Sequence, residues 1–341
     1  MKKIDVFPHI FPKPLLDRAS RVAVEPVLGQ FKRNSGIPVL YDLDARFRVM
    51  DQFGDYVQVL TISNPPIEAI GAPPTSTELA RVGNDTLAEL CVKYPDRFLG
   101  FAASLPMNDV DGTLREIDRA INELGALGVQ IYTNVLGRPL DDPLFDQFWA
   151  KVAQMNKPIW VHPARSPAMP DYATEDHSKY EIWWTFGWPY ETAVFMARVV
   201  FSGILDRYPN LKILTHHGGS MVPHFSGRIG PGMENLGNRT PGAEGDALVR
   251  QRETMAKKPV EYFKMFYGDT ALFGAGHAIR CAMDFLGLDH MMFGSDMPFD
   301  PERGTAFIRW TIENIGELSL SEAQLADLYQ NNAARILGVR V

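Results

Sequence analysis

Histidine is scarce in this chain, and its placement suggests metal chemistry. Only eight of the 341 residues are histidine. Four of them, His9, His162 and the adjacent pair His216 and His217, follow or end short apolar runs, and Asp296 ends another such run in the segment FGSDMP. Imidazole nitrogens together with one carboxylate form a site suited to Zn²⁺, Mn²⁺ or Fe²⁺. If the fold brings these side chains together, they predict a centre for one divalent metal ion, with zinc favoured.

Each of these residues also has a simpler explanation when taken alone. A single histidine at a strand end is commonly a hydrogen-bonded structural group, and Asp296 could cap a helix. The coincidence of four strand ends with ligand-type side chains favours the metal site. The remaining histidines are expected to be structural or surface groups: His177, His224, His277 and His290.

Eight short runs rich in β-branched residues must position the candidate ligands. They are residues 3–7, 56–63, 98–105, 128–133, 158–163, 211–217, 265–272 and 291–296. These runs are mostly continuous rather than alternating, which is typical of strands buried on both faces of a parallel sheet.

Helical patterns separate many of the runs and follow the last one. They cover residues 77–94, 111–125, 143–156, 190–208, 275–287 and 321–338, and the first of these helices should be capped by Thr77 or Ser76. Eight strands interleaved with helices predict an α/β fold of the (β/α)8 TIM-barrel type. No Gly-x-Gly-x-x-Gly segment follows a strand, so a dinucleotide-binding doubly wound sheet has no support.

Long insertions interrupt this alternation at three places. They are residues 10–45, 163–189 and 218–257. All three fall where strands end, which is the functional face of a barrel. The candidate site extends from His9 to Asp296, so a boundary between two domains would divide it. We therefore expect a single domain over residues 1–341.

Composition excludes several classes of partner. The chain has 34 basic and 41 acidic residues and no run of lysine or arginine, so neither nucleic acid nor an anionic membrane surface is expected. No segment approaches the ~20 apolar residues of a membrane span, and the N-terminal residues lack the apolar core of a signal peptide. Two cysteines, Cys91 and Cys281, are too few for a disulfide framework and are expected to be buried free thiols. These features indicate a cytoplasmic protein.

Motifs along nearly the whole chain resemble the amidohydrolase-related decarboxylases, the family typified by aminocarboxymuconate-semialdehyde decarboxylase. The matching segments are KIDVFPH at the start, ARFRVMDQFG (45–54), GWPYET (187–192), YPNLKILTHHGGSMVPHFSGRI (208–229), FGSDMPF (293–299) and NNAARILG (331–338). The resemblance implies metal-dependent, non-oxidative decarboxylation of an aromatic or dienoic carboxylic acid. It also implies metal ligands at His9, His162 and Asp296.

The same resemblance implies a catalytic histidine on the sixth strand. Its spacing to Pro223 and Arg228 favours His217 over His216 as the acid/base, and Asp296 could share in proton transfer. Because side chains alternate along a strand, we expect only one of the two histidines to point into the barrel mouth. His216 should then be packed behind it or bonded to a loop.

The sequence departs from the family at Phe7, where a further metal ligand is usual. Phenylalanine cannot bind a metal, so three matched ligands remain unless His216, Asp5 or a loop residue substitutes. Three protein ligands and a water still form a workable catalytic zinc site. The superfamily's carboxylated lysine also has no counterpart, since Tyr132 ends the fourth strand, and this indicates a mononuclear site.

The resemblance assigns two arginines to the substrate carboxylate. Arg48 and Arg228 match the family positions, and guanidinium groups bind carboxylates in a bidentate manner. Trp184 and Trp188 could stack on a planar substrate. Surface ion pairs and loop packing are the simpler alternatives. Related enzymes are commonly homodimers, in which Arg228 could reach the neighbouring subunit's site.

Three functions remain open on the sequence alone. Decarboxylation is favoured, with His217 moving the proton and the metal polarising an adjacent oxygen. Metal-dependent hydrolysis of a lactone or amide, or a hydratase reaction, would use the same residues with water as a reactant. A non-catalytic barrel in which Phe7 marks a lost metal site is the third reading.

Overall fold

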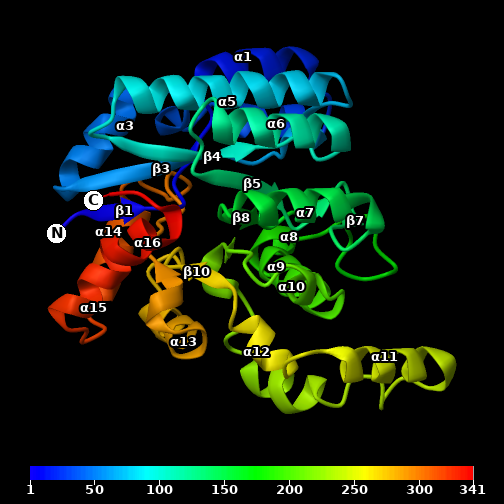
Figure 1. The fold of residues 1–341 in the computed structure, drawn as a ribbon. Coiled ribbons are helices and arrows are strands. Elements are labelled where there is room, and N and C mark those ends of the chain that lie inside the picture. Colours follow the sequence, from blue (N-terminus) through cyan, green and yellow to red (C-terminus); the bar gives the residue numbers. More distant parts are fainter. Residues whose placement is uncertain (341) are drawn as a thin grey trace.

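Eight parallel strands form the centre of the molecule, and helices surround them (Figure 1). This computed structural model describes residues 1–340. The strands follow one another around the barrel in chain order: β1 (Lys3–Asp5), β3 (Tyr56–Ile62), β4 (Phe98–Ser104), β5 (Gly128–Tyr132), β8 (Ile159–His162), β9 (Ile213–Thr215), β10 (Tyr267–Asp269) and β11 (Met291–Met292). Every predicted strand is present, each somewhat shorter than its apolar run. The fold is an α/β (β/α)8 TIM barrel, as predicted.

Backbone hydrogen bonds join the first and last strands without a full ladder. Val6 N donates to Phe293 O at 3.0 Å, and Asp296 N donates to Phe7 O at 3.1 Å. Directly after β1, strand β2 (His9–Ile10) pairs with β3 in parallel. The barrel is therefore nearly closed, and closure places the residues after β1 beside those after β11.

The helices cover the outside of the barrel and occupy the insertions. They are α1 (Lys13–Val22), α2 (Val27–Asn34), α3 (Leu43–Met50), α4 (Ile67–Ile70), α5 (Thr75–Lys93), α6 (Val110–Asn122), α7 (Asp146–Met155), α8 (Ile182–Thr185), α9 (Gly187–Phe201), α10 (Ile204–Arg207), α11 (Gly242–Thr254), α12 (Pro259–Phe263), α13 (Gly276–Leu286), α14 (Ala306–Gly316), α15 (Glu322–Ala326) and α16 (Asn332–Leu337). A hairpin of β6 (Asn134–Val135) and β7 (Arg138–Pro139) follows β5. None of the helices within residues 1–340 is both long and apolar enough to cross a bilayer.

Several helix expectations were wrong in detail. The predicted helix at 190–208 is two helices, α9 and α10, because Gly203 adopts a left-handed conformation between them. The predicted C-terminal helix is likewise divided by a π-helical segment, Asp327–Asn331. Thr77 and Ser76 lie inside α5 and cap nothing, since the helix begins directly after Pro74.

Two apolar layers hold the barrel together. One fills the barrel interior with side chains such as Ile4, Val59 and Trp160, and the indole Nε1 of Trp160 donates to Val6 O at 2.8 Å across the barrel. The other lies between the strands and the outer helices. A packed interior leaves chemistry to the residues at the strand ends, where the insertions also lie.

The insertions extend the barrel on one side. In Figure 1, α11 projects away from the barrel, and Gly245 is its only buried residue. Cys91 and Cys281 are free thiols, as expected, but both are half-buried rather than buried. Burial raises the pKa of the Cys91 thiol to about 12, which keeps it protonated and unreactive.

Candidate metal centre

The five chemistry-bearing residues lie together at the carboxyl ends of the strands. His9 begins β2, His162 ends β8, His216 and His217 follow β9, and Asp296 follows β11. All five are buried. The imidazole ring centroids of His9 and His162 are 5.3 Å apart, and that of His216 lies 5.7 and 5.4 Å from these two. Parallel strand direction and barrel closure together produce this cluster.

Both histidines of the adjacent pair reach the cluster, which corrects the expectation that only one would. His216 Nε2 lies 3.3 Å from Asp296 Oδ1, and His217 Nε2 lies 3.4 Å from Asp296 Oδ2. Strand β9 ends at Thr215, so strand alternation no longer applies. His217 adopts a left-handed conformation with φ of 59°, and Asp296 does the same with φ of 62°. Such conformations cost ~1–3 kcal/mol in non-glycine residues and are found preferentially at functional sites.

Hydrogen bonds orient three of the imidazoles in the same way. His216 Nδ1 donates to Asp269 Oδ2 at 2.6 Å, and His162 Nδ1 donates to the carbonyl oxygen of Pro163 at 2.7 Å. His9 Nδ1 lies 3.2 Å from Thr61 Oγ1, whose own proton is donated to a backbone carbonyl. With Nδ1 bonded in each ring, Nε2 is the nitrogen left to bind a metal, which at His216 would displace a proton; this is the usual arrangement of metal-binding histidines.

The unsatisfied atoms of the cluster fit a divalent cation. Nε2 of His9 and Nε2 of His216 are buried and make no hydrogen bond, although Asp296 Oδ1 lies 3.0 and 3.3 Å away. Buried polar atoms are rarely left without a partner. The nitrogens of His9, His162 and His216 lie within 4.8 Å of one another, as do the ligand atoms of His216, His217 and Asp296. A metal ion among them would satisfy these atoms.

The electrostatics of the metal-free cluster favour neutral imidazoles at His9 and His162 beside a charged carboxylate, whereas His216 favours the protonated form. Burial lowers the pKa of His9, and it lowers that of His162 well below the usual value. Burial alone would raise the pKa of Asp296, but the neighbouring imidazoles, His216 first, hold it well below its usual value. Burial also opposes protonation of His216, yet Asp269 and Asp296 raise its pKa to about 9.

The predicted substrate-binding residues lie outside this cluster. Arg48 on α3 is exposed, and so is Arg228 in the π-helical segment Arg228–Gly232. Trp184 is half-buried and donates from Nε1 to Glu181 Oε2 at 2.9 Å. Trp188 is the tryptophan beside the cluster, with its ring 5.2 Å from that of His162.

Two buried residues of the site, Asp269 and Arg46, were not predicted from the sequence. Asp269 ends β10, and the strand-end rule that identified Asp296 applies equally to it. Arg46 is fully buried and donates from Nε to Gln58 Oε1 at 2.7 Å and from Nη1 to the carbonyl oxygen of His9 at 2.8 Å. Positions 46 and 48 point about 200° apart around a helix, so burial of Arg46 turns Arg48 outward. The segment ARFRVMD offers both arginines, and only the phase of α3 distinguishes them.

The remaining four histidines lie apart from the cluster. Three are exposed: His177, His224 and His277. His290 is half-buried, and its Nδ1 bonds the carbonyl oxygen of Phe266 at 2.9 Å. All four agree with the expectation of structural or surface roles.

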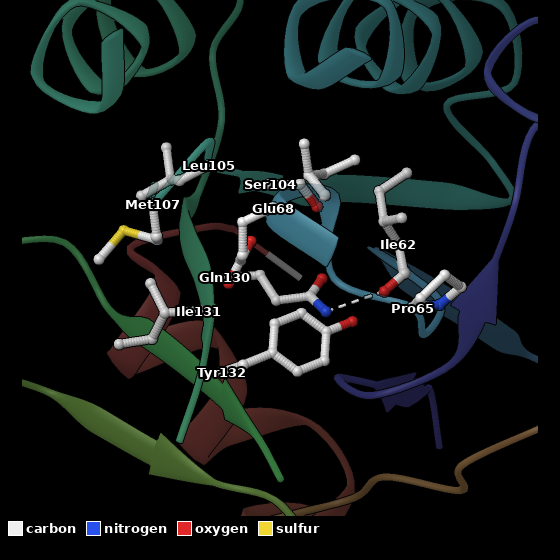
Figure 2. Close-up of a pocket in the computed structure, with 10 residues that line it drawn as sticks. Ile62, Pro65, Glu68, Ser104, Leu105, Met107, Gln130, Ile131 and Tyr132 are labelled. Carbon is white, nitrogen blue, oxygen red and sulfur yellow. Dashed lines mark hydrogen bonds between the residues drawn. The ribbon is translucent and has the colours of Figure 1, made fainter. Parts of the chain in front are cut away.

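A narrow pocket adjoins the cluster at the ends of β3, β4 and β5. Figure 2 shows the side chains of Gln130 and Tyr132 of β5 extending towards Ile62 and Pro65, with Glu68 of α4 beside Gln130, and Gln130 Nε2 donates to the carbonyl oxygen of Ile62 at 2.8 Å. Tyr132 lines this pocket, and its ring lies 5.2 Å from that of His162 in the cluster. Burial raises the pKa of Glu68 to about 8, so this carboxyl group is mainly protonated at neutral pH.

Fold and site together define a barrel protein with a histidine–aspartate metal centre at the carboxyl ends of its strands. The model of the amidohydrolase family matches residues 39–339, and the chain belongs to that family. The family resemblance inferred from the sequence motifs is thus confirmed.

Several similar proteins are decarboxylases by name. The chain is 30% identical over 302 residues to gamma-resorcylate decarboxylase of Rhizobium sp., covering 86% of each chain. It is 29% identical to 2-amino-3-carboxymuconate-6-semialdehyde decarboxylase of Dictyostelium discoideum, over 99% of this chain and 92% of that one. A solved dihydroxybenzoic acid decarboxylase from Polaromonas sp., with bound manganese and 2-nitroresorcinol, superimposes with a TM-score of 0.77 at 25% identity, covering 99% of this chain and 97% of that one.

Proposed function

We propose that this protein is a metal-dependent, non-oxidative decarboxylase. Its substrate would be an aromatic carboxylic acid or, alternatively, a conjugated dienoic acid. The observation that carries the proposal is that His9, His162 and Asp296 meet at one end of the barrel. His217 lies beside them, with Nε2 rather than Nδ1 directed to a carboxylate. The decarboxylase activity of the relatives supports the same reaction.

His9, His162 and Asp296 would hold the ion, since their free Nε2 and carboxylate atoms converge. A bound divalent ion supplies a positive charge that polarises a substrate oxygen beside the carboxyl group. We propose Zn²⁺, which suits a site rich in nitrogen ligands. Manganese is the alternative, because the Polaromonas structure contains it. Elemental analysis of the purified protein distinguishes them.

His217 would deliver the proton that replaces the carboxyl group. Loss of CO₂ leaves an electron pair on the ring carbon, and that carbon must gain a proton for the product to form. His217 Nε2 is placed to donate it, with Asp296 Oδ2 at 3.4 Å to stabilise the protonated ring. The Nδ1 atom of His217 is buried and has no hydrogen-bond partner. No hydrogen bond therefore keeps the proton on Nδ1, and Nε2 can carry the proton that it donates.

Aromatic side chains would enclose the substrate ring. Trp188 lies on one side of His162 and Tyr132 contacts the same imidazole, so a planar acid beside the metal centre would meet apolar faces. Trp184 packs on Trp188, with ring centroids 6.4 Å apart, and would support this wall. Exclusion of water there would favour loss of the carboxylate charge.

We further propose a cytoplasmic homodimer. Arg228 is exposed on an insertion that also carries the projecting α11, so a second subunit could bring this guanidinium to a substrate carboxylate. We propose the same role for Arg48. Its side chain is exposed on α3, so no contact within this subunit places it at the site. Light scattering on the purified protein and an Arg228→Ala variant test these assignments.

The reaction is tested by following carbon and solvent atoms. Dihydroxybenzoates incubated with the metal-loaded protein in D₂O should release CO₂ and gain one deuterium at the vacated ring carbon. His217→Ala should lower this rate by ~100- to 10,000-fold with unchanged metal content. Full activity in that variant would remove His217 as the proton donor. Hydrolysis of a lactone or amide with ¹⁸O from solvent in the carboxylic acid product, without release of CO₂, would establish the hydrolase instead.

A further inference from the structure

Phe7 occupies the cluster without being able to bind a metal. Its ring is fully buried and lies against the imidazoles, with centroids 5.7 Å from His9 and 6.4 Å from His162. Its closest aromatic neighbour is His216, on which it stacks with centroids 3.8 Å apart and planes inclined by 17°. An apolar ring therefore lies beside the cluster, and the polar side chain stacked directly on it is His216.

Contacts on three sides hold His216 in one orientation. Phe7 covers one face, and His217 stacks on the ring at 3.8 Å and 27°. Asp269 accepts the Nδ1 proton at 2.6 Å, and the carboxylate is itself held by the backbone N–H groups of Gly218 and Ala271. Both His216 and Asp269 are fully buried. The remaining atom, Nε2, can only face the cluster.

His216 and His217 differ in the way that distinguishes a ligand from an acid/base. In His216, Nδ1 is bonded to a carboxylate and the buried Nε2 has no hydrogen-bond partner. His9 has the same pattern, with a threonine hydroxyl in place of the carboxylate. A carboxylate–histidine pair of this kind fixes the tautomer and increases the basicity of a metal-binding nitrogen. In His217 the pattern is reversed, since Nε2 bonds Asp296 and Nδ1 has no partner.

We infer that His216 is the fourth protein ligand of the metal centre, replacing the ligand that Phe7 cannot provide, and that Asp269 is its positioning residue. The centre then consists of His9, His162, His216 and Asp296. The left-handed backbone at His217 makes this possible, because it releases the two histidines from strand alternation and leaves the second one free for proton transfer.

Metal binding tests this inference independently of activity. Protein freed of metal with a chelator is titrated with Co²⁺ in competition with an indicator dye, and the zinc-loaded form is analysed by X-ray absorption to count coordinated imidazoles. Wild type should bind one ion through three imidazoles. His216→Ala should retain two and bind Co²⁺ at least ~100-fold more weakly, and Asp269→Asn should bind ~10- to 100-fold more weakly.

Two further variants separate a lost ligand from a damaged fold. His217→Ala removes the neighbouring imidazole and should keep the wild-type affinity within about threefold. The double variant Phe7→His/His216→Ala returns an imidazole just after β1 and should recover affinity relative to His216→Ala. Circular dichroism of each metal-free protein establishes that it is folded. Recovery in the double variant also excludes general misfolding as the cause of the loss.

The inference rests on the proposed metal centre, and the two fail separately. If wild type binds no ion, the centre itself is refuted. If wild type binds one ion and folded His216→Ala binds it equally well through the same number of imidazoles, the centre stands and His216 is not its ligand. Loss of affinity in His217→Ala rather than His216→Ala would reverse the two roles and overturn the inference.

Discussion

The buried carboxyl group of Glu68 should make the protein less stable as the pH rises. Glu68 is 4% exposed, and its Oε1 atom has no hydrogen-bond partner. Burial raises its pKa from the ordinary value of 4.5 to about 8. Between these values the unfolded chain binds fewer protons at this position than the folded protein. The contribution of Glu68 to stability is therefore fully present below pH 4.5 and is lost as the pH rises towards about 8.

The size of the effect follows from the two pKa values. Linkage gives a loss of about 3 kcal/mol in the free energy of unfolding between pH 5 and pH 8 from this group alone. The Glu68→Gln variant cannot ionise and has nearly the same volume. Its stability relative to wild type should therefore rise by about 3 kcal/mol over that interval. Any effect of the amide on packing is independent of pH and leaves this slope unchanged.

Urea unfolding of wild type and Glu68→Gln at pH 5, 6, 7 and 8, followed by far-UV circular dichroism, measures the difference. Glu89→Gln is the matched control, because Glu89 is exposed on α5 and remains in water in both states. Its curve should run parallel to that of wild type. If the Glu68→Gln curve also runs parallel to wild type, Glu68 ionises in the folded protein as it does in the unfolded chain, and the argument from burial is refuted.

Three other expectations concern the centre and its support. Asp296→Asn keeps a side chain that tolerates the left-handed backbone but loses the negative charge. Its affinity for the metal should be at least ~100-fold weaker than that of wild type, so less metal should remain bound after dialysis. Full retention of the metal would contradict a ligand role for Asp296. Arg46→Met leaves the carbonyl oxygen of His9 and the side-chain oxygen of Gln58 without their donor. Because a buried acceptor without a partner costs ~1–3 kcal/mol, this variant should lose about 3 kcal/mol in urea unfolding. A loss below about 1 kcal/mol would show that these hydrogen bonds contribute little. Chelation of the metal should lower the melting temperature, and readdition at 1,000 times the dissociation constant should restore about 4 kcal/mol; identical melting curves would argue against a metal bound to the folded state.

The arrangement of the barrel was accessible from the sequence because it depends on local composition. Continuous apolar runs predicted all eight strands, and residues at the run ends predicted which side chains meet. The rule that parallel strands deliver their carboxyl ends to one face selected the histidines and Asp296 as candidates before any coordinates. The family resemblance then implied that His9, His162 and Asp296 are the metal ligands among them. That the chain forms one domain stays a prediction, which agrees with strands distributed from β1 to β11.

The roles of individual residues depended on local backbone geometry that composition does not encode. Strand alternation predicted that one of His216 and His217 would face away, but the strand ends at Thr215 and the left-handed turn at His217 admits both. Helix phase likewise buried Arg46 and exposed Arg48, although both lie in the same motif.

Sequence alone therefore determined the kind of fold, the face on which chemistry occurs and the residue types that gather there. The tertiary structure decided which nitrogen of each histidine faces the cluster, which carboxylate holds His216 and which imidazole Phe7 stacks on. The physical reason is that strand formation follows from short-range apolar patterning, whereas the orientation of His216 depends on Phe7 and Asp269, which lie far away in the chain and meet it only after the barrel closes.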